Sequence, residues 1–175
     1  MVFPQLTEPR ETLEKTYRSY LAEFSERQER LIPCVLEYDA RDFPALVRRL
    51  LDEAKGIGLP QDYVPASTFW LVDEQRTIVG VAHLRHSLTP ALEREGGHIG
   101  YSVRPSKRKE GHGTALLRMV LLRAKAMGIA RALLTCDRTN LASARVIQNN
   151  AGILDSEVPR KDGQGTIQRY WIDLA

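Results

Sequence analysis

The residue types and spacing of one central segment are suited to binding a phosphate. Residues 103–117 pass from a strand-like end, through a basic turn with two glycines, into an apolar stretch. Such a turn directs several backbone N–H groups at one point, beside the positive end of the dipole of the following helix. Three consecutive basic residues surround that point: Lys107, Arg108 and Lys109. The segment therefore predicts a binding site for a phosphate or a pyrophosphate.

Other phosphate-binding motifs narrow the class of ligand. The Gly-Lys-Ser/Thr triplet of a P-loop does not follow Gly111, and Leu116 stands where a dinucleotide fingerprint would have its third glycine. Gly111 and Gly113 would allow close approach of the backbone to a ligand. An acyl-CoA pyrophosphate is therefore favoured over ATP or NAD. A plain strand-to-helix turn without a ligand is the simpler alternative.

The composition of the chain is that of an ordinary globular protein. Its 175 residues carry a formal charge of +3, with 43% hydrophobic and 27% charged residues, so we expect one domain over residues 1–175. Acidic and basic residues are mixed along the chain, which gives no arm or stripe for nucleic acid. The apolar runs are too short to cross a bilayer, and the first residues lack the pattern of a secretory signal. We expect a cytoplasmic protein with no nucleic-acid or membrane partner.

The two cysteines do not suggest a metal site or a disulfide. Cys34 and Cys136 lie far apart, and neither has a Cys or His neighbour at the spacing of metal ligands. Cys136 lies in an apolar segment, where a buried structural thiol is the expected state. No metal is expected.

Hydrophobic periodicity supplies the elements that would position the central segment. Helices are predicted at residues 10–29, 42–56, 111–127 and 140–150. Strands are predicted at residues 2–6, 68–72, 77–86, 97–103, 130–136, 153–158 and 166–173. The second and third of these strands form one expected antiparallel hairpin, and the last two form another. The order of elements indicates a mixed α/β (α+β) domain.

The arrangement resembles the GNAT (Gcn5-related N-acetyltransferase) superfamily, in its bacterial branch of predicted acetyltransferases. The family's pyrophosphate loop, Arg/Gln-x-x-Gly-x-Gly/Ala, corresponds to residues 108–113, and its preceding Val-x-Pro to residues 103–105. A second family element, an Asn followed by a small residue three positions on, corresponds to Asn140 and Ser143. Residues 68–173 follow the order of the family. The resemblance implies a mostly antiparallel central sheet of about six to seven strands, flanked by about four helices.

The resemblance also implies acetyl-CoA as cosubstrate and an amine of a small molecule or a peptide as acceptor. Backbone groups of residues 99–103 would bind the pantetheine arm, and their strand would part from the strand at 130–136. The implied cofactor-binding residues are Tyr101, Ser102, Val103, Arg108, Lys109, Glu110, Gly111, His112, Gly113, Thr114, Asn140 and Ser143.

The candidate catalytic residues are His98, Tyr101 and Ser143. His98 stands where many family members have a glutamate, and it is either a general base or a strand histidine with no catalytic role. Ile147 replaces the tyrosine that donates a proton in many relatives, so Tyr101, Ser143 or solvent would supply that proton. Asn140 either contacts the cofactor or only caps a helix. His83 and His86 are either acceptor-side or structural residues.

Two alternatives to an enzyme remain from the sequence. The missing tyrosine is compatible with a non-catalytic acyl-CoA-binding module or regulator, and the phosphate loop is compatible with a small nucleotide-binding regulator. The acceptor pocket of an enzyme is expected at residues 42–56, 59–67 and 87–96, where Glu93 and Glu95 would attract a cationic amine. A monomer and a homodimer are both compatible with the sequence.

Overall fold

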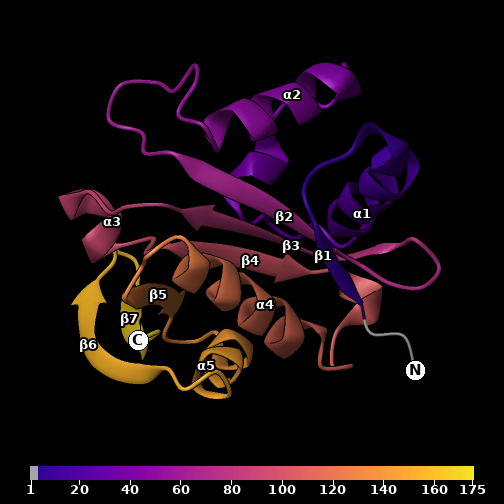
Figure 1. Ribbon diagram of the computed structural model, residues 1–175. Helices are drawn as coiled ribbons and strands as arrows, with labels where there is room; N and C mark the ends of the chain where they lie inside the picture. The colour runs from indigo at the N-terminus through magenta and orange to yellow at the C-terminus, as the bar shows by residue number, and fades with distance from the viewer. Residues whose placement is uncertain (1–3) are drawn as a thin grey trace.

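The computed structural model describes residues 4–175 and contains two β-sheets with helices packed against both faces of the strands (Figure 1). The first sheet has the order β1-β2-β3-β4, and the second has the order β5-β7-β6. All neighbouring strands are antiparallel. The strands of the first sheet are β1 (Gln5–Thr7), β2 (Ala66–Val72), β3 (Ile78–Arg85) and β4 (Ile99–Val103). Those of the second are β5 (Arg131–Asp137), β6 (Ile153–Pro159) and β7 (Thr166–Asp173).

Helix α2 (Phe43–Glu53) has a start signal that the sequence shows. It begins after Asp42, whose carboxylate accepts the N–H of Ala45 at 3.0 Å, as expected of an N-cap. The long helices are α1 (Glu14–Glu26) and α4 (His112–Ala126), and α5 (Leu141–Gln148) is shorter. Short segments complete the set: α3 (Pro90–Arg94) and the 3₁₀ helices η1 (Glu11–Leu13), η2 (Cys34–Glu37) and η3 (Pro105–Lys107).

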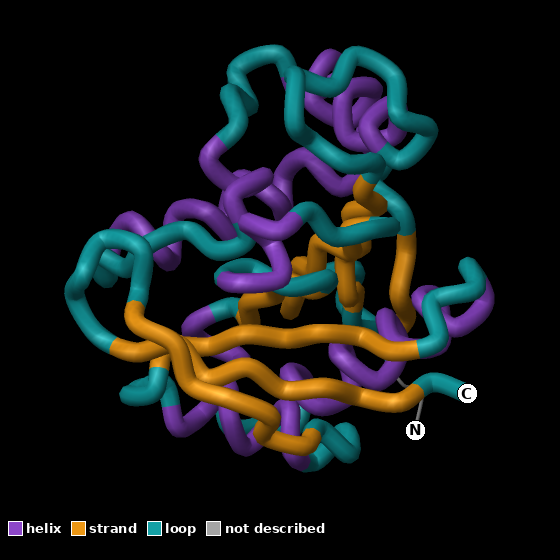
Figure 2. The backbone as a smooth tube through the Cα atoms, turned by 90° about the vertical axis from the view of Figure 1, so that its left-hand side faces the viewer, coloured by secondary structure: helices purple, strands orange, loops and turns teal. Residues whose placement is uncertain are grey.

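Two apolar clusters fill the spaces between the strands and the helices. In Figure 2 the helices lie above and below the strands. One cluster joins α4 and α5 to both sheets, and the other joins α1 and α2 to the first sheet. Gly80 of β3 permits the close approach of α4, since a Cβ there would lie 2.9 Å from a side-chain carbon of Leu116. Trp70 is fully buried between β2 and the N-terminal helices, with its ring centroid 5.1 Å from that of Tyr17.

The two sheets meet at one isolated bridge between Gly97 and Leu134. The N–H of His98 donates to the carbonyl of Leu133 at 2.7 Å, and the described strands β4 and β5 share no ladder beyond this point. Gly97 has φ +64°, and a Cβ there would lie 2.4 Å from the Leu133 oxygen. The junction therefore depends on a residue without a side chain.

The structure confirms the predicted fold class and nearly every predicted element. The seven strands and the four main helices follow the predicted order. The expected parting of the strand at 97–103 from its neighbour corresponds to the separation of β4 from β5. The first strand covers residues 5–7, and residues 2 and 3 of its predicted range lie outside the described residues. The predicted loop at 87–96 contains the short helix α3, which Thr89 caps by accepting the N–H of Leu92.

The junction generates a prediction about stability. Gly97→Ala should lower the free energy of unfolding by about 3 kcal/mol, because it adds a steric clash to the cost of a left-handed backbone. Gly163→Ala is the matched control, since Gly163 has φ +73° and open space around its Cβ position, and it should cost only about 1 kcal/mol. Urea unfolding of both variants measures the difference. Equal losses would show that close packing at the junction contributes nothing.

Candidate active site at the β4–α4 loop and the β4–β5 separation

The first turn of α4 presents backbone donors that the protein does not use. Ala115 is the first residue of this helix whose N–H bonds backward, to the carbonyl of Gly111 at 3.1 Å. Among the described residues, the N–H groups of His112, Gly113 and Thr114 donate no hydrogen bond. These groups point out of the helix N-terminus, where the dipole is positive. The arrangement suits an anion with several oxygen atoms.

The two positions in this loop require glycine for different structural reasons. Gly111 has φ +83° and open space at its Cβ position, so it is required for its backbone conformation. A Cβ on Gly113 would lie 3.2 Å from Val146 of α5 and 3.4 Å from Val103 of β4. Gly113 therefore lets α4 pack closely on its neighbours, and its missing side chain does not face the free N–H groups.

The basic side chains of the loop differ in their contacts. Arg108 forms a two-pronged ion pair with Glu29, in which Nη1 donates to Oε1 at 2.9 Å. No ion pair involves Lys107 or Lys109 within residues 4–175, so their charges remain available to attract an anion. The loop also contains Glu110, which lies 3.3 Å from the ring of His112.

Strand β4 offers a second set of unused backbone groups. The carbonyl of His98 accepts the N–H of Arg85, and the N–H of Arg104 donates to Val79, so even-numbered residues bond to β3. Because backbone direction alternates along a strand, Ile99, Tyr101 and Val103 direct their backbone groups to the side where β5 has separated. The carbonyl of Val103 accepts a hydrogen bond from Arg108 Nε at 3.3 Å, so the N–H is the unused backbone group of this residue. An extended ligand could bond to this edge as an added strand. The even-numbered Ser102 faces β3 with its backbone, and its hydroxyl lies 2.9 Å from the Tyr20 hydroxyl.

A pair of polar side chains connects β4 to α5. The Tyr101 hydroxyl lies 3.0 Å from the Ser143 hydroxyl. Burial raises the pKa of Tyr101 to about 12, although the Ser143 hydrogen bond partly opposes this. Burial likewise raises the pKa of the Cys136 thiol to about 11, which leaves it protonated at neutral pH. The pair of Tyr101 and Ser143 thus carries protons that it can donate.

Two further predicted positions lie at α5. The side chain of Asn140 accepts the N–H of Ser143 at 3.0 Å. This is the N-cap hydrogen bond expected if Asn140 caps the helix. Ile147 is fully buried in the apolar core, where a tyrosine hydroxyl would need a partner. The departure from the family pattern at this position is therefore accommodated by packing.

His98 is fixed by its own hydrogen bonds. Its Nδ1 accepts the N–H of Leu133 at 2.9 Å, so the neutral ring carries its proton on Nε2. The only free lone pair of the neutral ring is thereby used, which favours the structural interpretation of His98 over that of a general base. Burial, followed by the charge of Arg85, lowers its pKa. His98 is 8% exposed and holds the junction of the two sheets together.

The other strand histidines also have local partners. Nδ1 of His83 lies 3.1 Å from the Thr68 hydroxyl, and Nε2 of His86 lies 2.8 Å from the Ser67 hydroxyl. Burial lowers the pKa of His83 to about 3 and lowers that of His86 as well. Both contacts favour their structural interpretation.

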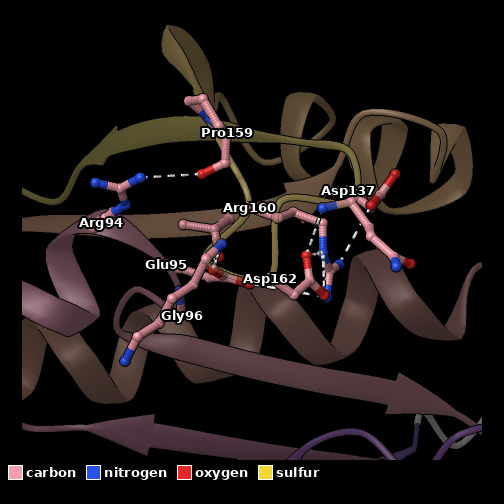
Figure 3. A network of polar contacts seen from close by, with 10 residues as sticks. Arg94, Glu95, Gly96, Asp137, Pro159, Arg160 and Asp162 are labelled. Carbon is pink, nitrogen blue, oxygen red and sulfur yellow. Dashed lines mark hydrogen bonds and ion pairs between the residues drawn. The ribbon is translucent and has the colours of Figure 1, made fainter.

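Figure 3 shows a polar network beside the end of β5, with Arg160 at its centre. The guanidinium of Arg160 contacts carboxylate oxygens of Asp162 at 3.3 Å, Asp137 at 3.4 Å and Glu95 at 4.0 Å. Glu95 also accepts the N–H of Lys161 at 3.1 Å. The turn between β6 and β7 is thus tied to the segment around α3. Because its carboxylate already has these partners, Glu95 is poorly placed to attract an amine.

Sequence reasoning missed the distant residues that hold the β4–α4 loop and the end of β5 in place. Glu23 and Glu29 of the α1 region bind residues of the β4–α4 connection, and Arg160 binds the end of β5. These partners lie tens of residues away along the chain, and no local spacing marks them. A buried arginine such as Arg104 demands a carboxylate partner, but its position in the sequence does not say which.

Within residues 4–175 the structure has no group of three or more metal-ligating side chains. In the same range, no helix has both the length and the apolar character that crossing a membrane requires.

Comparison with known proteins identifies the arrangement. A model of the acetyltransferase (GNAT) family matches residues 31–153. No protein with a curated function matches the sequence of the chain. Among solved structures, the ribosomal L7/L12 alpha-N-protein acetyltransferase RimL, in complex with coenzyme A in a disulfide with a cysteine of that protein, is similar with a TM-score of 0.72. The two sequences are 17% identical, and the match covers 99% of this chain and 95% of that chain.

Two further solved structures are similar over nearly the whole chain. The microcin C7 self-immunity acetyltransferase, in complex with acetyl-CoA and AMP, has a TM-score of 0.72 at 12% identity, covering 99% of this chain and 93% of that chain. A spermidine N-acetyltransferase chimera from Vibrio cholerae and hSSAT has a TM-score of 0.67 at 11% identity, covering 99% and 96%. At these identities the likeness shows the fold.

The histidines generate a prediction about pH. Their pKa values in the folded chain lie below the unfolded value of about 6.5, so the unfolded chain binds more protons as the pH falls. Stability should be complete above pH ~6.5 and should decrease below it, toward the folded pKa values, by up to ~1.4 kcal/mol per pH unit for each histidine.

Urea unfolding between pH ~8 and ~5.5, where few carboxylates titrate, measures this slope. In His83→Gln, the new amide keeps a hydrogen-bond partner for Thr68. The slope of unfolding free energy against pH should be smaller in this variant by the contribution of one histidine. A slope that is the same in the variant would contradict the assignment of His83 as a buried neutral ring.

Proposed function

Because the chain belongs to the acetyltransferase (GNAT) family, we propose that it transfers the acetyl group of acetyl-CoA to a primary amine by direct attack in a ternary complex. One observation carries this proposal. The free N–H groups at the start of α4 and the free edge of β4 are two unsatisfied sets of backbone groups joined by one loop. Coenzyme A has a pyrophosphate for the first set and an amide-bearing pantetheine arm for the second.

The residues proposed to hold acetyl-CoA follow from this fit. The pyrophosphate would bind the N–H groups of residues 112–114, with Lys107 and Lys109 attracting its charge. The pantetheine arm would bond to the backbone of Tyr101 and Val103. Arg108, Glu110, Gly111, Asn140 and Ser102 contribute to the shape of the site through the contacts described above.

The proposed chemistry uses groups on either side of the separation between β4 and β5. When bound, acetyl-CoA supplies the acyl group and a thiolate as leaving group. A backbone N–H of the free edge of β4 would stabilise the oxyanion that forms during attack. As the C–N bond forms and the C–S bond breaks, Tyr101, through Ser143, would donate a proton to the departing thiolate, and the attacking amine would lose a proton to solvent, from which Tyr101 is reprotonated. His98 would keep the two strands in position and take no part in proton transfer.

The acceptor is proposed to be an amine of a small molecule or a peptide. Similar structures include enzymes whose names specify a ribosomal protein or spermidine as acceptor. Residues around α2, the loop at 59–67 and the region of α3 would form the acceptor side, with Glu93 more exposed than Glu95. We place the protein in the cytoplasm as one domain without a nucleic-acid partner.

Titration of the full chain with acetyl-CoA, followed by detection of released thiol across a panel of amines, tests the function. Binding together with thiol release on at least one amine supports it. Binding without release on any amine would favour the alternative, a non-catalytic acyl-CoA-binding module. Stronger binding of ATP than of acetyl-CoA would contradict the assignment of the loop.

The loop generates a prediction with a control at the other end of the same helix. Gly111→Asp should weaken acetyl-CoA binding at least ~100-fold, because its carboxylate would compete with the phosphate for the free N–H groups. Gly128→Asp is the control: Gly128 follows α4, has φ +84° and also has open space at its Cβ position. It should bind acetyl-CoA normally in calorimetry. Similar losses in both variants would show that only backbone strain matters.

The polar pair generates a prediction about rate. Tyr101→Phe and Ser143→Ala should each lower kcat about 10- to 100-fold, with little change in the KM for acetyl-CoA, because each removes a donor but no backbone ligand. The thiol-release assay measures both constants on the best amine of the panel. An unchanged kcat in both variants would assign the proton to solvent.

A further inference from the structure

The connection between β4 and α4 is held from outside by two carboxylates of the α1 region. Glu23 accepts hydrogen bonds from the Arg104 guanidinium at 2.7 Å and from both the N–H and the hydroxyl of Ser106 at 3.0 Å. Glu29, just beyond the helix, accepts from both terminal nitrogens of Arg108. These contacts bind residues at both ends of the stretch 104–108. We call the two carboxylates with this stretch the α1 clasp.

The first end of the clasp is rigidly anchored. Arg104 is 4% exposed and donates to the carbonyls of Ile78 at 2.7 Å and Thr16 at 3.0 Å, as well as to the hydroxyl of Ser19 at 3.0 Å. A buried guanidinium with this many partners has one orientation available. The loop therefore leaves β4 in a fixed direction.

The second end is held by Arg108. Its Nε donates to the carbonyl of Val103 at 3.3 Å, its two terminal nitrogens bind Glu29, and its guanidinium lies 5.6 Å from the ring centroid of Phe24. All three nitrogens of the side chain thus have protein partners. Fork-to-fork pairs of this kind fix geometry as well as supplying energy.

The stretch beyond the clasp needs such support. Lys109 and Gly111 both have positive φ, at 66° and 83°, and the N–H groups of residues 112–114 that follow have no partner among the described residues. A loop with these features gains many conformations when its ends are free. Ordering it on binding would then reduce affinity.

We propose that Glu29 is a positioning residue for the coenzyme, acting through Arg108 so that the loop is ordered before the pyrophosphate arrives. The inference rests on the proposed function, since it assigns the ligand of the α4 N-terminus to acetyl-CoA. In this arrangement Arg108 shapes the loop and the main chain binds the phosphates. Glu29 improves affinity even though its charge has the same sign as that of the ligand.

The test uses the full chain and four variants. Glu29→Gln and Arg108→Gln each break the ion pair, and the double variant closes a mutant cycle. Glu26→Gln is the control. Glu26 is exposed at the end of α1, and its substitution removes one negative charge without breaking a contact to the loop. Calorimetry with acetyl-CoA gives the dissociation constant, and backbone hydrogen exchange of the free protein reports order at the hydrogen-bonded amides of Ser106, Lys107 and Ala115.

The expected results separate the clasp from simpler explanations. Glu29→Gln and Arg108→Gln should each weaken acetyl-CoA binding about fivefold, the double variant should be no weaker than Arg108→Gln, and Glu26→Gln should bind as the unaltered chain does. Exchange of the Ser106, Lys107 and Ala115 amides should quicken in Glu29→Gln while the centre of α4 stays protected. A merely structural role would not confine the change to this loop.

Other results would overturn the inference. Unchanged or tighter binding in Glu29→Gln would show that its charge only repels the ligand, and additive losses in the double variant would show that Arg108 binds the phosphate directly. If the unaltered chain does not bind acetyl-CoA, the proposed function fails, whereas the exchange measurement on the free protein still decides whether the clasp orders the loop.

Discussion

The point at which β4 stops pairing with β5 determines what the rest of the structure can do. Backbone groups that leave a ladder must find other partners, in water or in a ligand. Here the separation is sharp, because Gly97 allows a contact at which any side chain would collide and His98 bonds to Leu133 through both its backbone and its ring. Beyond this junction the free edge of β4 leads directly into the free N-terminus of α4. Two unsatisfied regions are thereby joined along one path of the chain.

A second constraint is that the residues supporting this path are far from it in the sequence. The junction joins residues 35 positions apart, and the contact between Glu29 and Arg108 joins residues 79 positions apart. The N-terminal helices are thus more than a cover for the apolar face of the first sheet. They fix the direction in which the loop leaves β4, while α4 and α5 pack against the opposite face. The candidate site lies where these two halves of the chain meet.

The elements were largely predictable because their signals are local. Alternation over residues 97–103, the apolar character of α4 and the cap at Asn140 each follow from a few adjacent residues. The loop between β4 and α4 was predictable for the same reason, as were the free N–H groups that follow Gly111, whereas phosphate binding there stays a prediction. The partners of His98 and Arg108 were not, because a histidine or an arginine in a sequence does not indicate which distant group completes its hydrogen bonds. The helix α3 was missed because five residues are too few to show a period.

Strand β6 has a consequence for how the molecule meets its neighbours. It lies at the outer edge of the second sheet, so no strand in the described part of the chain bonds to one side of its backbone. Ile153 and Leu154 are exposed there, at 70% and 46% of their surface, a combination that invites strand addition and aggregation. Asp155 and Glu157 bring charge to the same strand, and Pro159 ends it without a donor. These residues act as gatekeepers, because another chain that docked along this edge would have to desolvate both carboxylates.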